Sequence, residues 1–352
     1  KGARVLHINA TSFGGGVAEI LYTLVPLMRD VGLDAEWRII MAEQEFYEGT
    51  KIMHNALQGN ELGLEPAQRV IYEKNNRMTS ESLGKGFDFV VIHDPQPLLV
   101  RHFAGDLGAK WIWRCHIDTS TPNQEVADYL LPYVSEYDTA LFTLDDYVFK
   151  GLKIPVKVIA PAIDPLSTKN MALSPEDADY VVSQFGVEAD RPLLLQISRF
   201  DPWKDPLGVI DAYKIVKQEF AAVRLALVGS MATDDPEGWS FFTSTVEHAG
   251  DDSDVLILSN LNNVGNLEVN AFQSRADVII QKSTREGFGL TVSEGLWKAK
   301  PTIGGNVGGI PSQIDDGQTG FLVDSVEQCP GKCRWAPDNP KEAKPLGRAR
   351  KA

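Results

Sequence analysis

Short runs of hydrophobic residues alternate with longer stretches of helical periodicity along most of this chain. After the first run, for example, apolar residues recur at positions 17, 20, 21, 24, 27 and 28, which is the spacing of one helix face. The runs that predict buried strands are residues 5–8, 37–42, 89–92, 110–115, 139–142 and 156–159 in the first half and residues 193–197, 225–228, 255–258, 276–280 and 321–323 in the second. Because strands that alternate with helices form parallel sheets covered by helices, the pattern predicts an α/β fold with two doubly wound, Rossmann-like domains.

The connection between the two halves is polar and contains prolines at positions 155, 161, 165 and 175. We therefore place the domain boundary within residues 163–167, which gives a first domain over residues 1–165 and a second over residues 166–325. The remaining residues, 326–352, differ in character, because prolines at positions 330, 337, 340 and 345 interrupt what should be an amphipathic helix. We expect an irregular tail there.

Three consecutive glycines, Gly14, Gly15 and Gly16, follow the first predicted strand and precede a helix. Such a turn places backbone N–H groups near the carboxyl end of the strand, where open α/β sheets bind ligands. The next glycine is Gly32, so the G-x-G-x-x-G fingerprint of dinucleotide-binding proteins is absent, which weakens a dehydrogenase interpretation. The three glycines alone are equally compatible with a tight turn that has no ligand.

Two further strands of the first half end in polar residues. His93 and Asp94 follow residues 89–92, and His116 and Asp118 follow the next strand. If that strand continued, His116 and Asp118 would share one face and project into a binding site. The alternative is structural, with His116 satisfied in the core and Asp118 capping a helix.

The second half opens with a strand, a turn and a helix, and the turn carries Arg199 and Lys204. Two cations held at the carboxyl end of a strand suggest a site for a diphosphate, with arginine as a planar fork and lysine as a point charge. The alternative is that both cations only pair with Asp201 and Asp205 in the same turn.

Residues 281–311 are the most informative part of the chain. A predicted strand leads through Gly287 and Gly289 into a helix, whose N-terminus attracts phosphate through its unpaired N–H groups. Glu286 in the turn can accept hydrogen bonds from sugar hydroxyls, and Glu294, placed near the first helical turn, can accept from both hydroxyls of a ribose. The alternative is that Glu294 only complements the helix dipole and Glu286 only ends a loop.

Composition narrows the class of protein. With 352 residues, 43% of them hydrophobic and 23% charged, the chain has the composition of a globular protein. Its formal net charge of −14 argues against nucleic-acid or anionic-membrane partners. The apolar runs are too short to span a bilayer and no apolar signal segment follows Lys1, so we expect a cytoplasmic protein.

The sequence predicts neither a catalytic cysteine nor a bound metal. We interpret Cys115, Cys329 and Cys333 as non-catalytic. No D-x-D follows a hydrophobic strand, so we expect no protein metal site and no obligatory cofactor, which leaves open a divalent metal that accompanies the substrate.

These motifs together resemble a known family. The pattern E-G-F-G-L-x-x-x-E-G from Glu286, the G-G-I-P of residues 308–311 and the S-R-x-x-x-x-K of residues 198–204 are similar to the donor-site signature of retaining, nucleotide-sugar-dependent glycosyltransferases with two Rossmann-like domains, the GT-B fold of the glycogen-synthase and sucrose-synthase-like family. The segments I-H-D-P-Q-P (92–97), W-R-C-H-I-D-T-S (113–120) and P-A-I-D-P-L-S (161–167) resemble the subgroup that makes or cleaves trehalose, especially the archaeal-type trehalose synthases. Lys282, where the family more often has proline, and Ser312, where it often has glutamate, depart from the pattern. The tail does not resemble the longer C-terminal segment that packs on the first domain in this family.

The resemblance implies an activity: transfer of glucose from UDP-, ADP- or GDP-glucose to free glucose, with retention, to form trehalose. It also implies roles for individual residues. The donor would be bound by Gly14, Gly15, Gly16, Arg199, Lys204, Glu286, Gly287, Phe288, Gly289, Leu290, Thr291 and Glu294, the acceptor by His116, Asp118, His93 and Asp94, and catalysis would depend on Arg199, Lys204, Glu286 and His116. The sequence leaves open a trehalose phosphorylase, another retaining transferase of this fold, an inactive sugar-binding module, and a homodimeric assembly.

Overall fold

The computed structural model describes residues 2–13, 15–231 and 237–338, with side chains up to residue 333. The described residues fall into two compact units. One comprises the residues up to Pro161, and the other begins at Ala162. Residues 339–352 of the predicted tail lie outside the described residues, as does Gly14.

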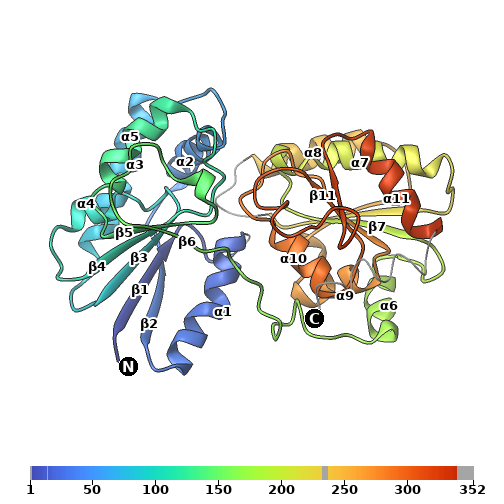
Figure 1. The fold of residues 1–352 in the computed structure, drawn as a ribbon, viewed down its shortest axis with the longest axis horizontal. Coiled ribbons are helices and arrows are strands. Elements are labelled where there is room, and N and C mark those ends of the chain that lie inside the picture. Colours follow the sequence, from blue (N-terminus) through green and yellow to red (C-terminus); the bar gives the residue numbers. More distant parts are fainter. Residues whose placement is uncertain (1, 14, 232–236, 339–352) are drawn as a thin grey trace. The chain divides into compact units, whose positions relative to one another are not determined.

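The first unit is a parallel sheet with helices on both faces. Its strands lie in the order β2-β1-β3-β4-β5-β6 and all pair in parallel. Helix α1 covers one face and α2 to α5 the other (Figure 1). The strands are β1 (Arg4–Asn9), β2 (Asp34–Ile39), β3 (Phe89–His93), β4 (Lys110–Arg114), β5 (Thr139–Phe142) and β6 (Val156–Val158), and the helices are α1 (Gly16–Asp30), α2 (Gln44–Leu57), α3 (Pro66–Glu81), α4 (Val100–Ala104) and α5 (Gln124–Val134).

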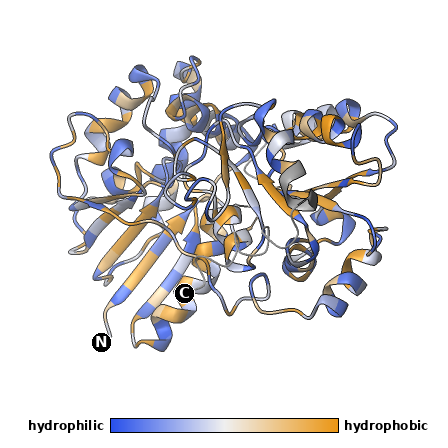
Figure 2. Cartoon of the chain, turned by 45° about the vertical axis from the view of Figure 1, so that its right-hand side comes forward, coloured by the Kyte–Doolittle hydropathy of each residue, from blue (hydrophilic) through white to orange (hydrophobic). Residues whose placement is uncertain are grey.

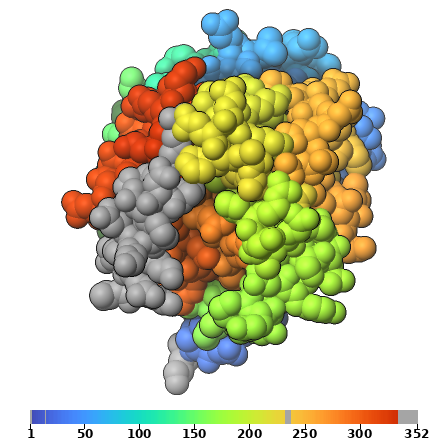
Figure 3. Space-filling model, turned by 90° about the vertical axis from the view of Figure 1, so that its right-hand side faces the viewer, coloured from blue at the N-terminus to red at the C-terminus, as the bar shows by residue number. Residues whose placement is uncertain are grey.

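The second unit is also a parallel sheet between helices, in the strand order β12-β11-β10-β7-β8-β9. Helices α7, α8 and α11 cover one face, and α6, α9 and α10 lie on the other (Figure 1). Helix α6 packs against α9 (Figure 3). The elements are α6 (Pro175–Ser183), β7 (Leu193–Ile197), α7 (Pro206–Lys217), β8 (Arg224–Gly229), α8 (Gly238–Ala249), β9 (Val255–Ser259), α9 (Asn266–Arg275), β10 (Val278–Gln281), α10 (Leu290–Trp297), β11 (Thr302–Gly305), β12 (Phe321–Val323) and α11 (Gln328–Asp338).

The two sheets and their helices confirm the predicted α/β class. Most strand residues are hydrophobic, as Figure 2 shows, because both faces of each sheet are covered. One strand was not predicted. It is β11, whose short sequence T-I-G-G gave little hydrophobic signal. No described helix is both long and apolar enough to cross a membrane.

The tail prediction was wrong over its first part. Residues Gln328–Asp338 form helix α11 despite Pro330. Pro330 is the third residue of that helix, where the backbone N–H has no partner within the helix, so the ring costs little there. Cys329 and Cys333 are fully buried on the face of α11 that packs into the core of the second unit. This packing anchors the helix.

Candidate active site

In the second unit, the two motifs predicted to hold a nucleotide sugar follow two adjacent strands. Strand β7 pairs with β10 at the point where the strand order reverses, since the chain continues from β7 towards β8 on one side and from β10 towards β11 on the other. Open α/β sheets bind ligands at such a switch point, outside the carboxyl ends of the strands. Arg199 and Lys204 follow β7, and Glu286 follows β10.

The two motifs are joined by an ion pair between residues predicted for separate roles. Lys204 Nζ lies 2.7 Å from Glu286 Oε2. The same oxygen accepts a hydrogen bond from Ser283 Oγ at 3.0 Å, and Gln281 Nε2 lies 3.4 Å from it. Glu286 is largely buried, with 7% of its surface exposed. Its carboxylate is therefore fixed in position by side chains from both turns.

The turn after β7 has a defined shape. It contains a 3₁₀ helix, η2 (Pro202–Lys204), which is capped by Asp201, whose carboxylate accepts from the Trp203 N–H at 2.8 Å. Trp203 O in turn accepts from Thr284 N at 2.8 Å, which connects this turn to the one after β10. The turn therefore holds Lys204 at a fixed place.

One of the two cations of this turn, Lys204, has a different partner from the one that the structural alternative assumed. Arg199 Nη2 lies 3.5 Å from Asp201 Oδ2, as that alternative expected, and the arginine is partly exposed. Lys204 pairs with Glu286 rather than with Asp205. Asp205 instead binds Lys282 Nζ and caps α7 by accepting from a backbone N–H. Lys282, the residue directly after β10, is therefore linked to the residue that caps α7.

Helix α10 begins at a glycine whose conformation requires the absence of a side chain. Gly289 is the N-cap and has a φ of 88°, in the left-handed region. Gly309 lets the following loop approach, since a Cβ there would lie 2.6 Å from Phe288 Cα. Thr291 Oγ1 donates to Ile197 O at 3.1 Å, which fixes the N-terminus of α10 against the end of β7. The backbone N–H groups of Leu290 and Thr291 receive no cap from the side chain of an N-cap residue.

Glu294 lies deeper than the sequence suggested. It is the fifth residue of α10 rather than part of its first turn, and it is fully buried. Its Oε2 accepts a hydrogen bond from Gln273 Nε2 at 2.6 Å, and its Oε1 lies 2.8 Å from Lys169 Nζ. Both carboxylate oxygens therefore have partners within the second unit.

In the first unit, the glycine turn follows β1, which lies between β2 and β3 at the switch point of that sheet. Gly15 is the N-cap of α1 and accepts at its carbonyl from Glu19 N at 3.1 Å, and Gly16 begins the helix. The turn therefore lies at the edge of the sheet where the pattern of the sequence predicted it.

His116 and His93 form a hydrogen-bonded row with a third histidine, His7, which belongs to none of the sequence motifs. His93 Nδ1 lies 3.0 Å from His116 Nε2, and His93 Nε2 lies 3.0 Å from His7 Nδ1. His7 is in the interior of β1, and the three residues come from the neighbouring strands β1 and β3 and from the loop after β4. Burial lowers the pKa of His7 to about 4 and that of His116 to about 3, and lowers the pKa of His93 well below its ordinary value. All three imidazoles are therefore neutral at neutral pH.

The two aspartates beside these histidines have partners that shape the backbone. Asp94 has a φ of 61°, and its Oδ1 accepts from the backbone N–H of His116 at 2.7 Å. Asp118 is 2% exposed, and its Oδ1 accepts from Ser120 Oγ at 2.6 Å. Strand β4 ends at Arg114, so the strand alternation that was used to place His116 and Asp118 on one face does not extend to them. Asp118 does not cap the following helix, whose cap is Asn123.

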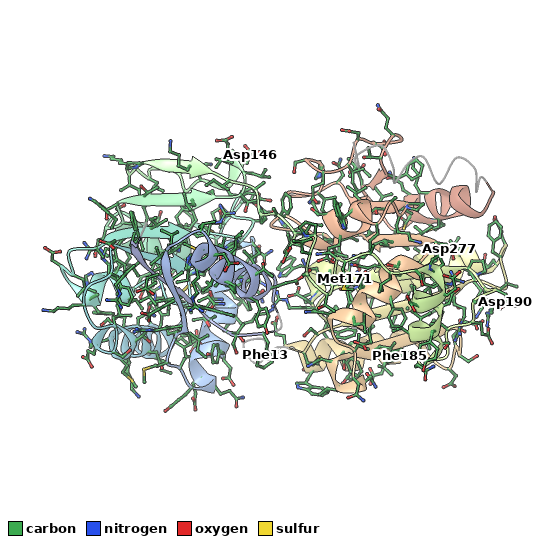
Figure 4. The ribbon with its side chains drawn as sticks, turned by 90° about the horizontal axis from the view of Figure 1, so that it is seen from below. Phe13, Asp146, Met171, Phe185, Asp190 and Asp277 are labelled. Atoms are coloured by element: carbon green, nitrogen blue, oxygen red, sulfur yellow. The ribbon has the colours of Figure 1, made fainter. Side chains whose placement is uncertain are left out.

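A pocket at the opposite edge of the second sheet does not belong to this site. Asp190 and Asp277, which are labelled in Figure 4, line it, and both precede strands rather than follow them. Arg275 also lines the pocket and pairs with Asp179 at 3.0 Å and with Asp277 at 3.2 Å. Among the described residues, no group of three or more His, Cys, Asp or Glu side chains is arranged to hold a metal ion.

Comparison with known proteins shows the family of the chain. Residues 7–149 match the family model described as "Trehalose synthase, N-terminal domain", and residues 181–351 match "Glycosyl transferases group 1". The chain is 58% identical to the trehalose synthase of Rubrobacter xylanophilus over 99% of this chain and 85% of that protein. It belongs to the trehalose synthase family.

Other trehalose synthases and a solved structure extend the comparison. The enzyme of Thermococcus litoralis is 48% identical over 99% of this chain and 85% of its own length. The solved structure of sucrose-phosphate synthase from Thermosynechococcus elongatus superposes with a TM-score of 0.77 at 16% identity, covering 98% of this chain and 92% of the other. The first comparison supports the family, and the second shows the shared GT-B fold.

Proposed function

We propose that this protein transfers glucose, with retention of configuration, from a nucleoside diphosphate glucose to free glucose and so forms trehalose. The observation that carries the proposal is the ion pair of Lys204 with Glu286, which brings the two donor motifs together at the switch point of the second sheet. A trehalose-related glycosyltransferase follows from the family. The nucleotide donor, the free glucose acceptor and the retaining course are the proposal.

The second unit would bind the nucleotide sugar. Arg199, Lys204 and the N-terminus of α10 would hold the diphosphate and stabilise the negative charge that develops on it as the bond to glucose breaks. Arg199 is partly exposed, so its guanidinium is accessible to a phosphate. Gly287, Phe288 and Gly289 would let the sugar and phosphates approach the backbone closely.

The two glutamates would contact different parts of the donor. Glu286 would accept hydrogen bonds from hydroxyls of the transferred glucose while its Oε2 keeps Lys204 in place. Glu294 would contact the ribose, and because its carboxylate is enclosed, this contact requires Lys169 to release or share Oε1. Lys169 is thus a residue of the donor site that the sequence gave no reason to select.

The first unit would bind the acceptor glucose. His116 and Asp118 would form hydrogen bonds with its hydroxyls, while His93 and Asp94 position His116 from behind through its ring and its backbone N–H. The family pattern also assigns Gly15 and Gly16, at the start of α1, to binding of the donor. These assignments follow the family pattern together with the contacts described above.

The reaction route follows from the state of the carboxylates. A double displacement needs a carboxylate nucleophile, with a second carboxyl group about 5 Å away. Glu286 and Glu294 are each paired with a lysine, which weakens both as nucleophiles. We therefore favour front-face displacement: the acceptor oxygen bonds to C1 of glucose on the face from which the diphosphate leaves, and a phosphate oxygen takes the acceptor's proton.

Product analysis tests the proposal. The full chain is incubated with UDP-, ADP- or GDP-glucose and free glucose, and the disaccharide is identified together with its anomeric configuration. Trehalose and a nucleoside diphosphate are expected, and trehalose with the diphosphate should give the reverse reaction. A different disaccharide would refute the acceptor assignment. Cleavage of trehalose that depends on inorganic phosphate, without any nucleotide, would favour a phosphorylase instead.

Two variants test the acceptor residues directly. His116→Ala and Asp118→Ala should reduce transfer much more than they reduce nucleotide binding, because both residues lie in the first unit. Unchanged transfer in both variants would refute their role, whereas equal loss of nucleotide binding would place them at the donor.

A further inference from the structure

The direction of the hydrogen bonds in the histidine row of His7, His93 and His116 can be deduced from its far end. A neutral imidazole carries one proton, so each ring donates at one nitrogen and accepts at the other. A row of such rings must therefore run in one direction throughout. The direction of the row determines whether the remaining nitrogen of the last ring, His116 Nδ1, is a hydrogen-bond donor or an acceptor.

The first ring ends at a group that can only accept. His7 Nε2 lies 3.3 Å from the sulfur of Met28, on helix α1. A thioether has lone pairs and no hydrogen to donate. A proton on His7 Nε2 makes this contact weakly attractive, whereas a bare Nε2 would face sulfur with one lone pair against another. The contact therefore favours the proton of His7 on Nε2.

The rest of the row follows from this assignment. With its proton on Nε2, His7 accepts at Nδ1, so His93 must donate from Nε2 across 3.0 Å. His93 then accepts at Nδ1, so His116 must donate from Nε2, again across 3.0 Å. The rings of His93 and His116 are nearly parallel, with centroids 5.3 Å apart. His116 is left with an unprotonated Nδ1.

The surroundings of the three rings keep them neutral, so each ring carries one proton. The guanidinium of Arg114, in β4 beside His93, repels a second positive charge on His93 and on His116 and adds to burial in lowering the pKa of both. Asp94 accepts at Oδ1 from the backbone N–H of His116 at 2.7 Å. No described group hydrogen-bonds His116 Nδ1, and His116 is partly exposed.

We propose that Met28, His7 and His93 are positioning residues that hold His116 as the Nε2–H tautomer, so that His116 Nδ1 accepts a hydrogen bond from a sugar hydroxyl. The choice of a sugar as ligand rests on the proposed function, but the tautomer does not. Such a site selects ligands by the direction of the hydrogen bond, because a group that contacts His116 Nδ1 must donate a hydrogen.

The first test reads the tautomers in the free protein. Long-range ¹H–¹⁵N correlation spectra of the full chain, labelled at its six histidines, distinguish Nε2–H from Nδ1–H rings. His7→Gln, His93→Gln and His116→Gln variants assign the signals. All three rings should be Nε2–H at pH 7. An Nδ1–H form of His116, or a charged ring at that pH, would overturn the proposal.

A second variant tests whether Met28 sets the direction. Met28→Leu keeps the volume and removes the acceptor, and the position is only partly buried, so the fold should persist. Nδ1–H forms should then appear at His7, His93 and His116 together. Tautomers identical to those of the wild type would show that the thioether does not direct the row.

The third test uses the reaction. A series of deoxyglucoses and deoxyfluoroglucoses is tried as acceptor, because fluorine accepts weakly but cannot donate. At the hydroxyl that Nδ1 contacts, both analogues should be equally poor, with the ratio kcat/KM reduced roughly tenfold or more. A fluoro analogue that rescues the deoxy analogue at every sensitive position would mean that His116 donates, which contradicts the proposal.

If His93 positions His116, a change at His93 should affect the KM for glucose and leave the KM for the nucleotide sugar unaffected. His93→Phe should raise the KM for glucose about fivefold, the value of one neutral hydrogen bond, and leave the KM for the nucleotide sugar unchanged. An equal rise in both would refute positioning of the sugar ligand. Absence of any transferase activity in the wild type would refute the proposed function instead, and the tautomers measured in the free protein would still decide the row.

Discussion

Replacement of Glu294 by alanine should destabilise the second unit strongly, independently of any role in binding. Glu294 is fully buried, and its Oε1 lies 2.8 Å from the ammonium of Lys169, whose side chain is 11% exposed. At that distance and an effective dielectric constant of about 20, the attraction between the two charges is about 6 kcal/mol before desolvation. Because alanine would leave the Lys169 charge buried without this partner, the free energy of unfolding should fall by about 3–5 kcal/mol.

The contacts around Lys169 explain why the loss would not remain local. Residues 162–171 pass over α9 and α10, where Asn270 Nδ2 donates to Thr168 O at 2.9 Å and Trp297 Nε1 donates to Asn170 O at 3.0 Å. The Lys169–Glu294 ion pair and the hydrogen bond from Lys298 Nζ to Asn170 Oδ1 at 3.0 Å add charged contacts to this attachment. For a unit of this size each kcal/mol shifts Tm by about 2–4 °C, so a decrease of roughly 10 °C is expected.

Thermal and urea unfolding of matched variants measures the effect. Glu188→Ala, which removes one partner of the exposed pair with Arg191, is the control and should cost less than about 1 kcal/mol. Lys169→Met combined with Glu294→Leu removes both charges and should cost less than the sum of the two single variants. Single effects that add up in the double variant, or a Glu294→Ala cost as small as that of the control, would refute the reasoning.

Glu294→Ala should also affect ligand binding, and the milder variant Glu294→Gln separates the effect on stability from the effect on binding. Glu294→Gln keeps the shape and the hydrogen-bonding capacity of the side chain and should lose less stability than Glu294→Ala. If Glu294 contacts the ribose, its variants should bind a free nucleoside diphosphate more weakly even at temperatures where they are fully folded. Calorimetry well below Tm measures this affinity, and wild-type affinity in a folded Glu294 variant would remove the residue from the ribose site.

Three further outcomes follow from the site. Arg199→Ala and Lys204→Ala should each lower turnover roughly a hundredfold, because each removes a charge-assisted donor to the leaving group, and wild-type rates in steady-state assays would refute the diphosphate site. Glu286→Ala should cut turnover while barely changing the affinity for nucleoside diphosphate, and equal losses of affinity in Glu286 and Glu294 variants would contradict the two separate contacts. Below pH 6.5 the stability should fall, since His7 and His116 have folded pKa values of about 4 and about 3 against 6.5 in the unfolded chain, which therefore binds more protons. Urea unfolding should show a loss of about 2 kcal/mol per histidine between pH 7 and pH 5, less in His116→Gln, whereas a flat profile would contradict the neutral row.

The sequence by itself determined the features that depend on local spacing. Alternating hydrophobic runs and helical periodicity were sufficient for two α/β units, because each strand and helix buries a face that its own residues define. The spacing of residues predicted that Gly289 lies in the turn before a helix. Its φ of 88° is one that most other residues avoid, which explains why glycine is found there. The positions of Arg199, Lys204 and Glu286 after strands were likewise readable from the order of residues.

The tertiary structure decided which of these residues meet. Lys204 and Glu286 are 82 positions apart and touch only because β7 pairs with β10, an order that no local pattern specifies. His7 gave a weak signal as a histidine within an apolar strand, and its partner His93 became evident only when β1 and β3 were neighbours. Lys169 gave none, because a lysine in a polar connection is usually solvated, and only the docking of that connection on α10 buries it against Glu294. Pairing between distant segments is set by the packing of the whole sheet, so its consequences for charge and hydrogen bonding cannot be read from spacing along the chain.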